Sequence, residues 1–314
     1  MTRTKKQHFV PRFYLSNFTN DEGKLWTHDS LKNTLRQTTP DKTAYEKNFY
    51  SPVNEDGSRS DFIEDSLSKI EGVTSKIIPD LLSLKALDQE TKSDFAIFLA
   101  TMFSRSPAQL RQIAAFYGEV ADWVGTQSIE TENRRKEEEG QLTEQDIKFQ
   151  EFIRNKENYE MSVDRRVGLM AFKQSENLAA IMVKMNWTFE VSDTQELLTS
   201  DNPVFWIDAG PDPVSNTYGF GLKHPQAVIP FPLSSSVILR LDWFGSDDWT
   251  KHRLSKRKAK LANQYQAKHK DRHLYFKNRS EGFRKLGMKY SEPIQQLQSG
   301  RKSPNISVVR KLTS

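Results

Sequence analysis

Cysteine is absent from the 314-residue sequence. Its absence excludes disulfide bonds, thiol nucleophiles and zinc sites with cysteine ligands, and it is typical of proteins that work in a reducing compartment. Long apolar runs are missing too, since none approaches the roughly 20 residues that span a bilayer. No apolar segment follows the charged start at residues 1–8. We therefore expect no signal peptide, no membrane partner and a cytoplasmic location.

The spacings of common catalytic and nucleotide-binding motifs are also missing. The sequence contains no GxGxxG, GxxxxGK(S/T), HExxH or GxSxG. Among the six histidines, only His269 and His273 have the i, i+4 spacing of two metal ligands on a helix. That pair lies in a Lys- and Arg-rich stretch, which repels a cation. The cofactor is therefore unknown, and a divalent metal held by carboxylates stays open.

Charge is distributed unevenly along the chain. The net charge is +5, yet residues 251–314 carry 18 Lys and Arg against three acidic residues. A basic segment of this kind predicts a polyanionic partner, above all nucleic acid. The candidate contacts with its backbone are Lys256, Arg257, Lys258 and Lys260. The alternative is a solvated helix face followed by a disordered end, because no base-reading motif accompanies the charge.

Hydrophobic periodicity changes twice along the chain and predicts an α+β fold. Residues 24–28 and 34–38 have the composition of two strands joined by a turn, so we expect an N-terminal hairpin. Apolar residues then recur at helical spacing and predict helices over 61–81, 89–104, 108–123 and 167–185. Strand patterns follow at 187–191, 204–207, 227–233, 237–243 and 274–276, with a basic helix over 254–270. The expected fold is an N-terminal hairpin and a mostly antiparallel C-terminal sheet, with a large helical insert between them.

Residues 1–292 are predicted to form a single interwoven α+β domain, because the strands that flank the helical part, about 60–185, would share a sheet. The apolar segment 7–18 has too little surface to fold alone, so we expect it to pack against the C-terminal sheet. Residues 293–314 are rich in Gln, Ser, Gly, Lys and Arg and predict a basic mobile tail. The charged stretch 130–157 indicates either a solvated helical hairpin or a loose connection.

His8 and Arg105 are the first candidate site residues. His8 lies among aromatic and aliphatic residues, and a partly buried histidine with a pKa near neutrality can act as a general acid or base. Its alternative role is structural, with the imidazole bonded to a backbone carbonyl. Arg105 precedes Ser106 and Pro107 at a helix break, where its planar guanidinium could hold a phosphate or a carboxylate. The alternative is an Arg that offsets the helix dipole.

Carboxylates and an amide complete the set of candidates. Residues 199–203 end a strand, where side chains often face a cleft. Asp201 is the candidate ligand of a divalent metal or the base that activates water, and Asn202 could orient a substrate. An Asx turn at Asp201 is the alternative. Glu64 and Glu71 are seven residues apart and share one helix face, a spacing more typical of surface carboxylates than of a catalytic pair.

These residues lie in blocks that resemble a known family. Residues 7–15, QHFVPRFYL, are similar to the Q-H-x-V-P-x-x-Y-L signature of a widespread prokaryotic family known as a domain of unknown function. Further blocks that resemble the family follow in order at 48–50, 62–64, 70–71, 98–107, 198–204, 231–234 and 262–263. The resemblance covers residues 5–280, and the charged stretch 130–157 departs from it. It implies that His8, Arg105, Asp201 and Asn202 form one site, and it implies no particular activity.

The favoured hypothesis is a nucleic-acid-directed hydrolase, a nuclease of a prokaryotic defence or toxin system. In it His8 is the general acid or base, and Arg105 holds a phosphate oxygen. Asp201 binds a divalent ion or activates water. The alternative is a non-catalytic sensor module that binds a nucleotide, a peptide, a protein partner or a second copy of the chain. Convergence of His8, Arg105 and Asp201 on one cleft would distinguish the two.

Overall fold

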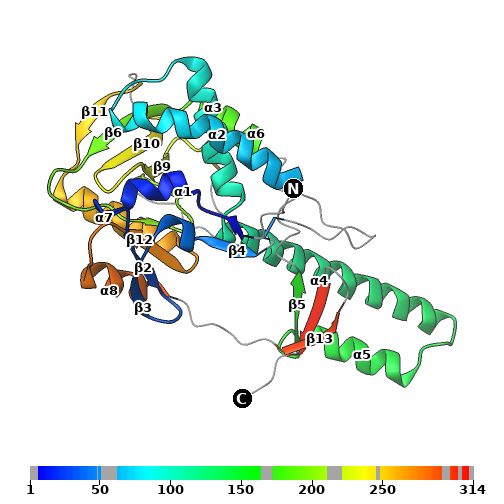
Figure 1. The fold of residues 1–314 in the computed structure, drawn as a ribbon. Coiled ribbons are helices and arrows are strands. Elements are labelled where there is room, and N and C mark those ends of the chain that lie inside the picture. Colours follow the sequence, from blue (N-terminus) through cyan, green and yellow to red (C-terminus); the bar gives the residue numbers. More distant parts are fainter. Residues whose placement is uncertain are drawn as a thin grey trace. The chain divides into compact units, whose positions relative to one another are not determined.

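The computed structural model describes residues 6–47, 49–50, 62–163, 172, 174–210, 221–244, 248–291, 298–302 and 306–310. The chain divides into two compact units (Figure 1). The first contains residues 1–109 and 171–293, and the second contains residues 110–170 and 294–314. The sequence predicts one domain over 1–292, whereas the structure groups the middle of the chain with the C-terminal segment.

The first unit contains a five-stranded sheet in the order β11-β6-β10-β9-β8. Its strands are β6 (Asn186–Val191), β8 (Ile207–Asp208), β9 (Ala227–Pro232), β10 (Val237–Asp242) and β11 (Lys251–Arg253). Its neighbouring strands are antiparallel, except that β11 is parallel to β6. Leu239 lies opposite Phe189 on one side and Phe231 on the other, so these three side chains share one face. This mostly antiparallel sheet, preceded by helices, confirms the predicted fold class.

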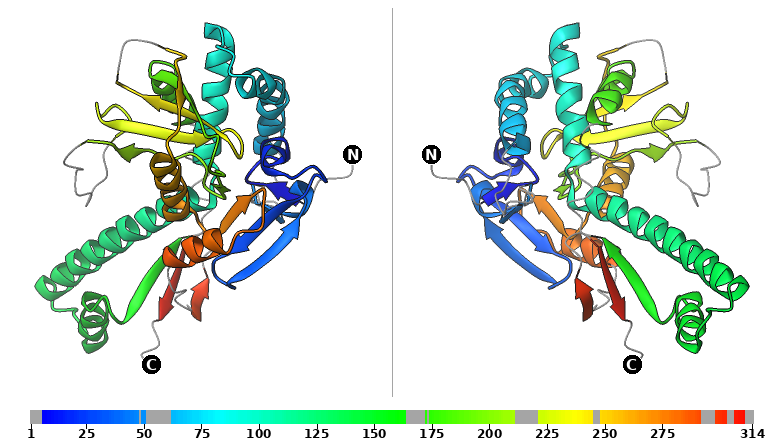
Figure 2. Two further views of the ribbon diagram at one scale, coloured as in Figure 1. Left: turned by 90° about the vertical axis from the view of Figure 1, so that its left-hand side faces the viewer. Right: turned by 90° about the vertical axis from the view of Figure 1, so that its right-hand side faces the viewer.

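Helices cover the face that carries Phe231. The ring of Phe95 in α3 (Gln89–Ser104) packs edge-on against that of Phe231, with centroids 6.2 Å apart. Helix α3 begins at Asp88, whose side chain accepts a hydrogen bond from the Thr91 amide at 2.8 Å. It contacts α6 (Ser175–Met182) and α2 (Phe62–Leu82), and Figure 2 shows α2 beside it. The helical insert is therefore built onto the C-terminal sheet.

A four-stranded sheet in the order β3-β2-β12-β7 joins the two ends of the first unit. It contains β2 (Leu25–Asp29), β3 (Thr34–Thr38), β7 (Thr199–Ser200) and β12 (His273–Phe276). The predicted N-terminal hairpin is confirmed as β2 and β3. Beside the sheet lie α7 (Lys256–His269) and α8 (Glu281–Lys289). Asn263 of α7 accepts the Leu198 amide and donates to the Glu196 carbonyl, which fixes α7 to the start of β7.

The N-terminal segment packs against the C-terminal sheet, as expected. It contains β1 (Lys6–His8), which pairs with β4 (Tyr45–Lys47), and the short helix α1 (Arg12–Leu15). The buried Tyr14 stacks on Phe231 with ring centroids 5.1 Å apart. Its hydroxyl donates to the Pro232 carbonyl at 2.8 Å and lies 2.7 Å from the Thr199 hydroxyl. Tyr14 therefore links three of the sequence blocks that carry the family resemblance.

The second unit contains most of the long helix α4 (Pro107–Glu138), followed by α5 (Glu144–Arg154) and β5 (Tyr159–Val163). Gly140, with φ of +68°, and the capping box of Thr143 with Asp146 turn the chain between the helices. The charged stretch 130–157 is therefore a helical hairpin. In place of the mobile tail expected for 293–314, β13 (Gln298–Lys302) and β14 (Ile306–Arg310) form a sheet with β5. None of the helices in the described ranges is long and apolar enough to cross a membrane.

Candidate functional site

One pocket of the first unit brings together residues from β1, α1, α2 and the end of α3. It has a volume of about 430 Å³. Its lining includes His8 and Arg105, and also Lys6, Arg12, Asp41, Glu64, Leu67, Ser68 and Glu71. We call it the His8 pocket. A neighbouring hollow of about 460 Å³ shares Arg12, Asp41 and Glu71 with it. His8 and Arg105, which are 97 positions apart, are thus parts of one site.

Gln7 and His8 are adjacent in β1 but contact different parts of the first unit. The Gln7 side chain is buried, and its Oε1 accepts the backbone amide of Tyr50 at 2.6 Å. Successive side chains of a strand point to opposite sides, so His8 is turned away from Gln7. His8 pairs with Tyr45 across β1 and β4, and their rings are 5.3 Å apart. Gln7 therefore secures the strand, and His8 lines the pocket.

His8 is held in its neutral form. Burial lowers its pKa most, and the positive charges of Arg12 and Arg105 lower the pKa further. A hydrogen bond with the Asp41 backbone and the carboxylate of Glu71 act in the opposite direction, and the net shift is downward. The Nε2 atom of His8 is buried and has no hydrogen-bond partner among the described residues. A neutral imidazole with an unpartnered nitrogen can accept a proton, which is what a general base requires.

Arg105 and Glu71 form an ion pair between α3 and α2. The Arg105 side chain is 1% exposed, and its Nη1 donates to Glu71 Oε1 at 2.7 Å. The Tyr50 hydroxyl donates to the Arg105 carbonyl at 3.4 Å. Glu71 is 29% exposed, and both members of the pair line the pocket. Arg105 thus holds a carboxylate, which is one of the two anions that its sequence position predicts.

Glu64 and Glu71 belong to a pocket wall, although their spacing favoured an ordinary surface position. The residues of α2 that line the His8 pocket are Glu64, Leu67, Ser68 and Glu71. Their spacing, i, i+3, i+4 and i+7, is that of one helix face. Both glutamates are half-buried. The sequence signal that could have found them is this mixed polar and apolar stripe, which adjoins the buried stripe of Thr74, Ile77 and Leu81 through the buried Leu67.

Asp201 and Asn202 are not among the residues that line the His8 pocket. The Asp201 side chain is 1% exposed and accepts three backbone amides, those of Asp271, Arg272 and His273, at 2.7, 2.8 and 2.6 Å. Asn202 donates to the His269 carbonyl at 2.8 Å. These bonds fix the turn after β7 to the loop before β12. Of the four residues expected to form one site, His8 and Arg105 line the pocket. Asp201 and Asn202 instead hold two backbone segments together.

The family match covers the pocket and the three sheets of the first unit. A family described as "Protein of unknown function (DUF4238)" matches residues 6–280. The chain belongs to the DUF4238 family. No curated protein and no solved structure matches the sequence. Membership in DUF4238 confirms the resemblance seen in the sequence, and the family description names no activity.

Two more features of this DUF4238 chain bear on its chemistry. Among the described residues, no three His, Asp or Glu side chains are grouped so that they could hold a metal ion. Four exposed cations occupy the first turns of α7, and they are Lys256, Arg257, Lys258 and Lys260. None of the four lines the His8 pocket. We call them the α7 patch, and its binding of nucleic acid stays a prediction.

The stability of the protein is expected to fall as the pH drops below about 6.5, the ordinary pKa of histidine. Burial is the largest cause that lowers the pKa of His8, His28 and His269. Because their folded-state pKa values lie below the unfolded value, the unfolded chain binds protons first. The contribution of these three histidines to the free energy of unfolding is therefore fully present above about pH 6.5. It is lost as the pH falls through their folded-state pKa values.

Urea unfolding at pH 7.5 and pH 5.5 measures this effect as a smaller free energy of unfolding at pH 5.5. His28→Gln removes a fully buried imidazole and should reduce the difference between the two pH values. His252→Gln, at an exposed position of β11, is the matched control and should leave it unchanged. Equal stability of the wild type at both pH values would contradict the neutral, buried state of these histidines.

Proposed function

We propose that the His8 pocket is the active site of a hydrolase that cleaves phosphodiester bonds in nucleic acid. The observation that supports it most is the convergence of a neutral histidine, a paired glutamate and exposed cations in one pocket. Lys6 and Arg12 are exposed and form no ion pair with another described residue, so their charges are available to a phosphate. A general base beside an anion-binding cation is the basic requirement of such a reaction.

In the proposed reaction, His8 takes a proton from the attacking water through Nε2. The resulting hydroxide attacks the phosphorus, the bond to the leaving oxygen breaks, and the imidazolium returns its proton to that oxygen. Arg12 stabilises the negative charge on the phosphate oxygens. Glu71 favours the imidazolium, since its carboxylate raises the pKa of His8.

Arg105 has an indirect role in this proposal. Its guanidinium is 1% exposed and is already paired with Glu71 at 2.7 Å. It therefore positions Glu71 beside His8, and the phosphate contact that the sequence assigned to Arg105 passes to Arg12.

An assay of the purified full chain tests the function. Labelled single- and double-stranded DNA and RNA are incubated with and without Mg²⁺ or Mn²⁺, and cleavage and binding are measured on the same samples. Cleavage of any of these substrates supports the hydrolase. Binding without cleavage between about pH 6 and pH 9, the range in which a histidine base is neutral, would support the non-catalytic module. A role in prokaryotic defence or as a toxin is a further proposal, which expression in cells tests through growth arrest.

The α7 patch is proposed to contact the nucleic-acid backbone. Changing Lys256, Arg257, Lys258 and Lys260 together to Gln is then expected to weaken binding and to reduce its salt dependence. The slope of log affinity against log salt should decrease by roughly one unit for each lost phosphate contact. Lys285→Gln with Lys289→Gln, two exposed positions on α8, is the control for a general loss of positive charge. An unchanged slope in the α7 variant would exclude the patch from the interface.

A further inference from the structure

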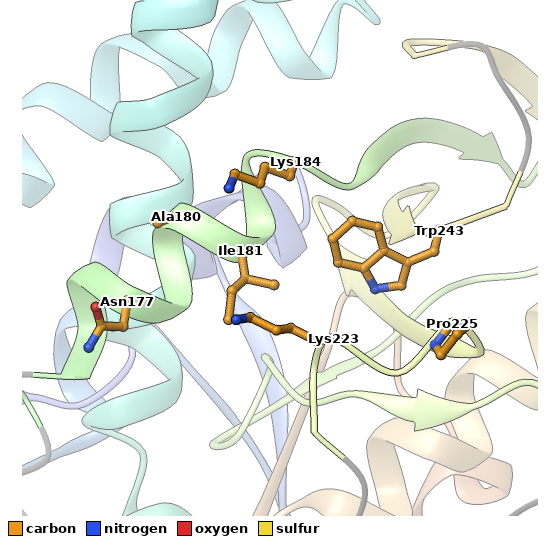
Figure 3. A pocket seen from close by; sticks show the side chains of 7 residues that line it. All are labelled: Asn177, Ala180, Ile181, Lys184, Lys223, Pro225 and Trp243. Atoms are coloured by element: carbon orange, nitrogen blue, oxygen red, sulfur yellow. The ribbon is translucent and has the colours of Figure 1, made fainter.

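A second pocket of the first unit lies between α6, the segment before β9, and the end of β10. Its volume of about 650 Å³ is in the range of small-molecule sites. Figure 3 shows its lining, which includes Asn177, Ile181, Lys184, Lys223, Pro225 and Trp243. We call it the Trp243 pocket. None of the described residues that line it belongs to the lining of the His8 pocket, so it is a separate site.

Trp243 supplies a fixed aromatic surface. Its indole Nε1 donates to the Leu222 carbonyl at 2.9 Å, which holds one edge of the ring and sets its orientation. The ring is half-buried, and in Figure 3 it lies across the pocket from Ile181 of α6. Pro225 adds a further apolar surface. A rigid indole opposite an aliphatic side chain is suited to a flat, uncharged ring system, because stacking on an aromatic face is favourable for every nucleobase.

Two lysines give the same pocket a positive charge. Lys184 follows α6, and Lys223 precedes β9, so they reach the pocket from different segments. Neither forms an ion pair or a side-chain hydrogen bond with another residue of the described ranges, and no acidic side chain is among the described lining residues. In Figure 3 the amino groups of both lysines lie on the Ile181 side of the pocket and point away from Trp243. Two like charges on one side of a pocket repel each other, and an anion bound beside both removes that repulsion. The site therefore favours a ligand with a negative group beside its flat ring.

We propose that the Trp243 pocket binds a nucleoside phosphate. The base stacks on Trp243 against Ile181, and the phosphate is held by Lys184 and Lys223. A free phosphate leaves the apolar surface unused, and an uncharged nucleoside leaves the two lysines without an anion. A nucleoside monophosphate satisfies both halves of the pocket at once. Because none of the described residues that line it belongs to the His8 pocket, which is the proposed active site, a nucleotide at Trp243 is assigned as an effector or sensor ligand rather than as the substrate.

Isothermal titration calorimetry of the full chain tests this site with AMP, GMP, CMP and UMP as probes. The reference ligands are the matching nucleosides and ribose 5-phosphate. At least one monophosphate should bind about tenfold more tightly than both its nucleoside and ribose 5-phosphate, because each reference lacks one half of the recognition. The double variant Lys184→Gln with Lys223→Gln should weaken the monophosphate by about tenfold or more and leave nucleoside binding unchanged. Trp243→Ala should weaken nucleoside and monophosphate alike.

Three controls keep the test decisive. The double variant Lys285→Gln with Lys289→Gln removes the same charge from α8 and should bind the monophosphate like the wild type. His8→Asn should also bind it normally, which separates this site from the His8 pocket even if the proposed hydrolase fails. Trp243→Phe keeps an aromatic ring and shows whether any loss in Trp243→Ala comes from misfolding. The proposal is overturned if no monophosphate binds more tightly than ribose 5-phosphate, if both lysine double variants lose affinity equally, or if His8→Asn abolishes binding.

Discussion

Replacing Asp201 by Ala is expected to lower the free energy of unfolding by at least about 3 kcal/mol. The carboxylate is buried and accepts the backbone amides of Asp271, Arg272 and His273. Alanine leaves three donors in the interior without an acceptor, and each such donor costs about 1–3 kcal/mol. The loop that these bonds fix leads directly into β12, the strand between β2 and β7. Its loss should therefore weaken the whole four-stranded sheet.

Chemical denaturation of Asp201→Ala measures this cost. Asp193→Ala is the matched control, because Asp193 is exposed and its ion pair with Arg253 lies at the surface, where such pairs contribute about 0–1 kcal/mol. Asp201→Asn keeps one acceptor oxygen, so its loss of unfolding free energy should lie between those of Asp201→Ala and Asp193→Ala. A variant Asp201→Ala that is as stable as the wild type but inactive would restore Asp201 to the active site, as the sequence alone predicted.

Glu71→Ala is expected to destabilise the protein by about 3 kcal/mol, the low end of the range for a broken buried ion pair. The low end applies because Glu71 is partly exposed, whereas Arg105 is 1% exposed and would be left as an unpaired charge in the interior. Glu71→Gln keeps an acceptor for Nη1 of Arg105, so it should lower the free energy of unfolding by less than Glu71→Ala does. Loss of the carboxylate should also lower the pKa of His8 further, since Glu71 raises it.

Urea unfolding measures the stability of these variants, and NMR titration of the His8 ring measures its pKa. Glu132→Ala is the control, since Glu132 pairs with Arg135 at an exposed position of α4. The double variant Glu71→Leu with Arg105→Met removes both charges and should be more stable than Glu71→Ala. If Glu71→Ala unfolds no more easily than Glu132→Ala, the pair does not hold α2 against α3.

Much of the fold follows from local sequence signals. Helix α3 begins after the N-cap Asp88 and ends before Pro107, and both residues could be recognised in the sequence. The hairpin of β2 and β3 has the turn chemistry of residues 30–33 between two β-rich runs. Such signals act over a few residues. They therefore determine where a helix or strand begins and ends, whatever other elements pack against it.

Other elements depend on contacts that no local pattern contains. The sequence predicts a helix that runs to about residue 123, whereas α4 continues to Glu138. Its last turns contact α5, where Lys136 pairs with Asp146 at 2.7 Å and Asn133 donates to Gln150 at 2.9 Å. The strand expected over 204–207 is reduced to β8, and Phe205 instead stacks on His269 with ring centroids 4.1 Å apart. The segment after residue 293 is mostly polar, yet its β-branched run Ile306–Arg310 forms β14 by pairing with β5. Long-range pairing of this kind cannot be derived from periodicity.

The candidate site was predicted in part. His8 and Arg105 were singled out for their chemistry, and they do share a pocket. Arg12 was missed because an exposed arginine on a short helix looks ordinary in sequence. Asp201 was misplaced because a carboxylate in a turn after a strand has the same local appearance whether it faces a cleft or, as here, three backbone amides. Only the tertiary structure shows which side it faces.

The most direct test of His8 as the general base of a nucleic-acid hydrolase compares two rates. They are the rates at which the wild type and His8→Asn cleave a labelled oligonucleotide. Asn keeps a polar side chain of similar size and removes the imidazole, so loss of the general base should reduce the rate by about 10²- to 10⁴-fold. The melting temperature should stay close to that of the wild type, and His252→Asn, at an exposed histidine, should cleave normally. A folded His8→Asn variant that cleaves at the wild-type rate, or a wild type that cleaves no nucleic acid, would contradict the account.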